Sequence, residues 1–163
     1  MKLHGLLKPA VLAGFVLMLA TATSAMACDF HYRSNTDPGT QAIINDPSLP
    51  DPPISDADCQ RFNHFADFLK ANDIAFAISS DQFVNSGVST AWAVVELKDH
   101  YGLMSRQQGL STRVQADPDD TVARRLRYYA IVRAMFMLDL DGAIQNLRQT
   151  EIKDGLKPIP VFH

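Results

Sequence analysis

The fold class of this chain depends on residues 74–102, which have the sequence IAFAISSDQFVNSGVSTAWAVVELKDHYG. Residues 74–78 form a short apolar run that suits either a buried strand or a turn of a buried helix. Residues 85–87, Asn-Ser-Gly, have the character of a turn. If residues 88–97 are a strand, every second side chain shares a face, and a hairpin with residues 74–79 results.

The same segment also fits a helix, because helical spacing gives residues 88–97 one continuous apolar face. Residues 96–98, Glu-Leu-Lys, favour helix by propensity, and Gly102 stands where a helix C-cap is expected. An isolated two-stranded hairpin is a marginal sheet. We therefore predict a helix here and a mainly α fold, a small bundle of about four helices. The alternative is an α+β fold with a hairpin of residues 74–79 and 88–97.

The flanking segments carry clearer helix patterns. Residues 56–71 repeat apolar side chains at helical spacing after a start that resembles a capping box. Residues 117–120, Asp-Pro-Asp-Asp, are typical of a helix start, and we expect the helix that follows to run to about Leu138. A turn at residues 139–142 then leads to a last helix. Residues 103–116 are polar and are predicted to be a loop.

Residues 1–27 are predicted to be a cleaved secretory signal peptide of bacterial type. They combine a positive start at Lys2 and Lys8 with an apolar stretch over residues 10–20. Residues 25–27, Ala-Met-Ala, fit the A-x-A rule for cleavage. We therefore expect the mature protein to be periplasmic or secreted.

The mature chain is expected to have two parts. Residues 28–54 are predicted to be a Pro-rich extended arm, and residues 55–163 a single globular helical domain. The signal peptide contains two of the 15 basic residues and none of the 18 acidic ones, so the mature chain is acidic. Nucleic acid and anionic membranes need a basic surface. We expect no nucleic-acid partner.

Cys28 and Cys59 are the two cysteines of the chain. Pairing them in an exported protein leaves no free thiol, so we predict a disulfide, worth ~3 kcal/mol in the chain-entropy model. Residues 25–28 also resemble the processing site of bacterial lipoproteins, although Ala25 replaces the usual Leu. Lipidation of Cys28 is the alternative, and only then do we expect contact with a membrane.

Residues with catalytic or metal-binding chemistry do not form a known motif. The loop that begins at Asp139 lacks the ligand spacing of a calcium-binding EF-hand. Nucleophile motifs such as G-x-S-x-G are absent, and the two glutamates, Glu96 and Glu151, lie in no motif. No spacing typical of a zinc site occurs among the histidines of the mature chain, which are His31, His64, His100 and His163. We predict no cofactor and no metal.

Arginines cluster in the helix predicted after residue 120. They suit either an anion or acidic-partner site, or a solvated face paired with acids. The cluster consists of Arg124, Arg125, Arg127 and Arg133, with Arg113 before it. Because Trp, Tyr and Arg often carry interface energy, we predict a partner surface that includes Arg124, Arg127, Trp92 and Tyr101.

The function that these observations favour is protein binding. We predict an exported envelope protein that binds another envelope protein as an inhibitor, an immunity-type factor or an accessory factor, without catalysis. Two alternatives remain open. One is a small periplasmic hydrolase with an Asp/His site, and the other is a lipid-anchored structural protein of the envelope.

Overall fold

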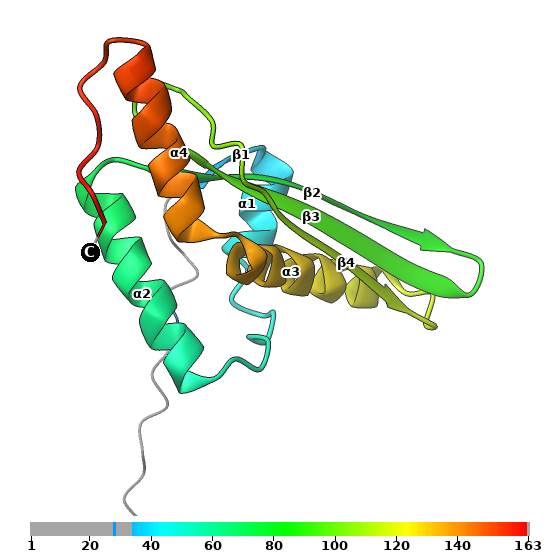
Figure 1. Ribbon diagram of the computed structural model, residues 1–163. Coiled ribbons are helices and arrows are strands. Elements are labelled where there is room, and N and C mark those ends of the chain that lie inside the picture. The colour runs from blue at the N-terminus through cyan, green and yellow to red at the C-terminus, as the bar shows by residue number, and fades with distance from the viewer. Residues whose placement is uncertain (1–27, 29–33, 163) are drawn as a thin grey trace, which may run out of the picture.

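The computed structural model describes Cys28 and residues 34–162 (Figure 1). The predicted signal peptide, His31 and His163 lie outside the described residues. The elements, in chain order, are β1 Ser34–Thr36, α1 Pro38–Ile44, α2 Asp56–Ala71, β2 Ala75–Asn85, β3 Val88–Lys98, β4 Gly109–Gln115, α3 Asp120–Met137 and α4 Leu140–Lys153. The strands form one sheet in the order β1-β2-β3-β4. The fold is therefore α+β, and the predicted helical bundle is wrong.

β2 and β3 form a long antiparallel hairpin where the sequence favoured a helix. Their register runs from Ala75 opposite Lys98 to Asn85 opposite Val88. Gly87 closes the turn with a φ of 105°, a conformation that glycine adopts without steric cost. The hairpin considered as the alternative shares residues 75–79 and 88–97 with this one, which extends to Asn85 on β2 and Lys98 on β3.

A third long strand explains why the hairpin is stable. β4 lies in the segment that was predicted to be a loop, and it pairs antiparallel with β3. The hairpin is thus not isolated, and the argument from marginal two-stranded sheets does not apply. Alternate residues of β3 from Ser89 to Leu97 are buried, whereas the residues between them are half-buried. This pattern of period two is typical of a strand with one covered face.

α3 lies along the covered face of the sheet (Figure 1). α3 can approach β3 closely because both elements place small, fully buried residues at the contact. These are Ala91 and Ala93 on β3, and Ala130 and Ala134 on α3. Gly109 of β4 marks a point of close contact. A Cβ atom added there would lie 1.9 Å from the carbonyl oxygen of Ala134. The backbones of β4 and α3 therefore meet without room for a side chain.

We expect Gly109→Ala to destabilise the fold by about 1–3 kcal/mol, because the added methyl group would push β4 away from α3. Urea unfolding of the mature protein measures the effect. Leu110→Ala is the matched control, since the Leu110 side chain is 58% exposed. A Gly109→Ala midpoint equal to that of the wild type would contradict the close packing of β4 on α3.

The N-terminal segment is more ordered than the sequence suggested. Residues 28–54 contain β1, which pairs in parallel with β2, and α1. The expectation of a fully extended arm is wrong at α1 because Pro38 occupies the first turn, where proline is tolerated. Asp37 caps this helix, accepting a hydrogen bond of 2.9 Å from the backbone N–H of Thr40.

The predicted disulfide between Cys28 and Cys59 is confirmed, with a Cα–Cα distance of 5.1 Å. The bridge uses the Cys28 sulfur, the atom that lipidation would modify. A disulfide is consistent with an oxidising compartment. Among the described residues, no helix is long and apolar enough to cross a membrane.

The helix predicted over residues 56–71 is confirmed as α2. Its apolar face, which includes Phe62 and Leu69, is buried in the core. After α4 the C-terminal tail returns to α2, where the ring of Phe162 stacks on Phe65 with centroids 4.3 Å apart. The tail thus packs on α2.

Candidate functional site

The helices contact the sheet from one side. α2 places Phe62 against Phe76 of β2, with ring centroids 5.9 Å apart, and α1 places Thr40 against Ser80, with hydroxyl oxygens 3.0 Å apart. The cross-strand partner of Ser80 is Ala93, which is buried on the α3 side of the sheet. Phe76, Ser80 and Ala93 therefore point toward the helices, and the residues between them on β2 and β3 point to the opposite side of the sheet.

Three cross-strand rows make up this opposite side, which we name the open face. The rows are Phe83–Thr90–Val114, Asp81–Trp92–Thr112 and Ser79–Val94–Leu110. Phe83, Leu110 and Val114 are 48%, 58% and 63% exposed. Trp92 and Val94 are half-buried between them. Trp92 is the diagonal neighbour of Phe83, Leu110 and Val114, within reach of an aromatic side chain, so these apolar residues group around it among polar ones.

The open face changes shape toward β1. A hollow of about 350 Å³ lies there, lined by residues that include Thr36, Ala77, Glu96 and Met104. Met104 is exposed, and the Glu96 carboxylate accepts a hydrogen bond from the side chain of Gln108. The face therefore has a flat apolar end near the hairpin turn and a concave, more polar end near β1.

β4 adds a second feature to this surface. It is the last strand of the sheet, and no strand in the described part of the chain pairs with its outer edge. The backbone N–H and C=O groups along such an edge can pair with a strand from another chain. The open face and this edge meet at β4.

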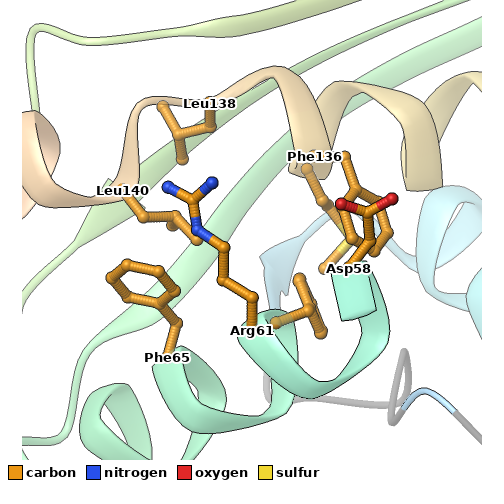
Figure 2. Close-up of a pocket in the computed structure, with 8 residues that line it drawn as sticks. Asp58, Arg61, Phe65, Phe136, Leu138 and Leu140 are labelled. Atoms are coloured by element: carbon orange, nitrogen blue, oxygen red, sulfur yellow. The ribbon is translucent and has the colours of Figure 1, made fainter. Parts of the chain in front are cut away.

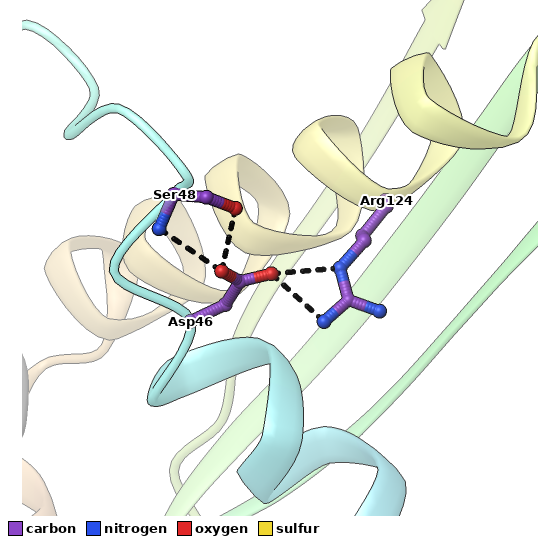
Figure 3. Close-up of polar contacts among 3 residues, drawn as sticks. All are labelled: Asp46, Ser48 and Arg124. Atoms are coloured by element: carbon purple, nitrogen blue, oxygen red, sulfur yellow. Dashed lines mark hydrogen bonds and ion pairs between the residues drawn. The ribbon is translucent and has the colours of Figure 1, made fainter.

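Arg124 contributes to the helical side of the molecule. Its Nε and one terminal nitrogen lie 2.9 and 2.8 Å from Oδ2 of Asp46 (Figure 3). The other carboxylate oxygen accepts hydrogen bonds from the backbone N–H and the hydroxyl of Ser48. The contacts from Ser48, and then those from Arg124, lower the pKa of the Asp46 carboxyl.

Arg127 has a similar role one turn further along α3. Its guanidinium donates to Oγ1 of Thr40 at 2.7 Å, and to the carbonyl oxygen and hydroxyl of Ser80 at 2.8 and 2.9 Å. The hydroxyl of Tyr128 donates to Asp51 at 2.7 Å. Burial, and then this bond, raise the pKa of Tyr128. These contacts hold the N-terminal segment on α3.

The structure therefore does not gather the four residues that the sequence suggested as a partner surface. Arg124 and Arg127 lie on the side of the sheet that carries the helices, and Trp92 lies on the open face. Tyr101 is 43% exposed in the turn after β3, where its ring centroid is 3.8 Å from that of His100. Among the described residues, no group of three or more His, Cys, Asp or Glu side chains is arranged to hold a metal ion.

A pair of acids is buried where α4 meets the turn after β3. Glu151 is fully buried, and its Oε2 accepts the backbone N–H of Ile159 at 2.6 Å. Oε1 of Glu151 and Oδ2 of Asp99 have no hydrogen-bond donor within the described part of the chain. Two carboxylates offer only acceptors, so a proton shared between them satisfies both oxygens.

Burial, and the neighbouring Asp99, raise the pKa of Glu151 above its ordinary value of 4.5, although the Ile159 N–H and the nearby His100 act in the opposite direction. The folded chain therefore binds more protons than the unfolded chain between pH 4.5 and the raised pKa. In that window, the contribution of this group to the free energy of unfolding falls as the pH rises.

We expect Glu151→Gln to remove this fall, because the amide does not titrate and can donate a hydrogen bond to Asp99. Urea unfolding of both proteins from pH 4 to pH 8 measures the difference. The stability of the wild type relative to the variant should decrease as the pH rises above 4.5. Asp99→Asn should weaken the same pH dependence. Parallel pH curves for wild type and Glu151→Gln would show that the two acids do not share a proton.

No protein-family model matches the chain, and neither the curated proteins nor the solved structures include a significant match. The candidate site therefore depends on the geometry alone. Phe83, Leu110 and Val114 were not predicted from the sequence. Leu110, Thr112 and Val114 recur at every second position of residues 109–115, and this spacing could have identified β4. It could not have identified the exposed side, because apolar residues with a period of two ordinarily mark the buried side of a strand.

Proposed function

We propose that this protein is an exported, non-enzymatic binding protein of a bacterial envelope, and that its partner is another protein bound through the open face. The observation that carries the proposal is the placement of Phe83, Leu110 and Val114 on one uncovered side of the sheet. Contiguous exposed apolar residues of this kind mark interaction surfaces. Export is supported by the predicted signal peptide and by the disulfide.

The chemistry of the open face favours a protein partner over a membrane or nucleic acid. Asp81 and Glu96 flank the apolar residues, and Lys98 provides the positive charge at the β1 end. Such a surface would repel phosphate groups more than it attracts them. The free edge of β4 suits a partner that contributes an extended segment, because backbone hydrogen bonds there add to the apolar contact. We therefore propose an apolar, strand-bearing protein surface as the partner.

The test is affinity capture with the tagged mature protein from its own envelope extract, followed by mass spectrometry. We expect one stoichiometric partner, and we expect Phe83→Lys with Leu110→Lys to abolish its capture, because charges would enter the apolar contact. The matched control is Met137→Lys with Ile152→Lys. These side chains are 54% exposed, and they lie on α3 and α4 instead of the sheet.

The outcome that contradicts the proposal is a partner that both double variants capture equally, or no partner at all. Sedimentation of the free protein adds a further check. If the open face instead joins two copies of this chain, the wild type sediments as a dimer and Phe83→Lys with Leu110→Lys as a monomer.

A further inference from the structure

A separate hollow lies on the helical side of the molecule, and we name it the arginine groove. It has a volume of about 450 Å³ and lies between the segment at residues 52–55, α3 and one side chain of β4. Its principal lining residues are Ile54, Arg113, Tyr129, Val132, Arg133 and Phe136. The four from α3 are spaced at i, i+3, i+4 and i+7, so they share one side of that helix.

The charges in the arginine groove are unbalanced. Arg113 and Arg133 are exposed, and within the described part of the chain neither forms an ion pair or a hydrogen bond. This distinguishes them from Arg124 and Arg127, which hold the N-terminal segment. Asp58 is the acid that lines the groove, and its carboxylate accepts a hydrogen bond of 2.6 Å from the Ser55 hydroxyl. Two arginines and one aspartate thus line the groove.

A second hollow adjoins the arginine groove at Phe136. A smaller hollow of about 70 Å³ shares Phe136 and Asp58 with the arginine groove. Figure 2 shows its lining, with Arg61 extending toward Leu140 and Asp58 beside Phe136. The guanidinium carbon of Arg61 lies 5.8 Å from the ring centroid of Phe65. The lining at this end therefore combines aromatic and aliphatic side chains with the charged Asp58 and Arg61.

The wall of the groove is fixed before any ligand arrives. The hydrogen bond from Tyr128 to Asp51 holds the chain next to residues 52–55. The Ser55 side chain then caps α2 by accepting the backbone N–H of Asp58 at 3.2 Å. A preformed wall reduces the entropy lost on binding.

We propose that the arginine groove binds a carboxylate carried on an apolar body. Arg113 and Arg133 hold the carboxylate, because the planar guanidinium matches its two oxygens. Tyr129 and Phe136, which are half-buried, contact the apolar body. The excess of one positive charge matches a monoanion and not a doubly charged phosphate. The volume lies within the range of pockets that take small organic ligands.

Two kinds of ligand carry a carboxylate on an apolar body. They are the C-terminal residue of a peptide and a free fatty acid. The proposal is independent of the open face, because Arg133 lies on α3, on the other side of the sheet. The groove and the open face are therefore tested by separate variants.

The test is a titration of the oxidised mature protein, followed by ¹H–¹⁵N NMR at pH 7. The probes are N-acetyl-leucyl-phenylalanine, the C-terminal amide of the same dipeptide, and octanoate. We expect saturable shifts at Ile54, Arg113 and Arg133 with at least one of the two acids. If the dipeptide acid binds, its amide should bind about tenfold more weakly or not at all. Whichever acid binds more tightly, the dipeptide or octanoate, identifies the source of the ligand.

The double variant Arg113→Gln with Arg133→Gln should weaken binding of the acid about tenfold or more. Arg106→Gln with Arg125→Gln is the matched control, because it removes the same charge at positions outside the groove. It should bind as the wild type does. The proposal is overturned if neither acid gives saturable shifts, if the dipeptide amide binds as tightly as its acid, or if both double variants lose affinity equally.

Discussion

The packing of α3 against one face of the β2–β3–β4 sheet is the constraint on which the rest of the structure depends. It requires small residues at the contact, and Gly109 meets the backbone of Ala134 where no side chain would fit. The core residues of β2 and β3 are buried by this contact and by α2. Because the helices all lie on this side, the sheet keeps an uncovered face, and that asymmetry creates the main surface available for binding.

The same helix organises the N-terminal segment. Arg124, Arg127 and Tyr128 project from α3 and bind Asp46, Thr40 and Asp51, so a proline-rich stretch follows a defined path. That path forms one wall of the arginine groove, and the disulfide ties its start to α2. The arginines of α3 thus differ in their contacts. Arg124 and Arg127 bind side chains of the N-terminal segment, whereas Arg133, nearer the end of the helix, forms no ion pair or hydrogen bond within the described part of the chain.

Local patterns sufficed for α2, for α3 and for the Cys28–Cys59 bridge, because each depends on spacing within a short segment or on cysteine parity. The hairpin at residues 75–98 was only the alternative prediction, because its stability depends on β4, in a segment that was predicted to be a loop. The roles of the arginines could not be predicted from the sequence either. Arg124 and Arg127 find their partners 78 and 87 residues away in the sequence, and no local pattern reveals which arginines remain free.

One face of the sheet is covered by helices, and the other is open. Hydroxyl-radical footprinting of the free, monomeric mature protein with mass spectrometry tests this arrangement most directly. Each rate is divided by the intrinsic reactivity of its residue type. On that scale we expect rapid oxidation of Phe83, Leu110 and Val114, slower oxidation of Trp92, and protection of Phe76, Leu97 and Ile131. Protection of Phe83, Leu110 and Val114 to the same degree as Phe76 would contradict it, because the face opposite α3 would then be covered.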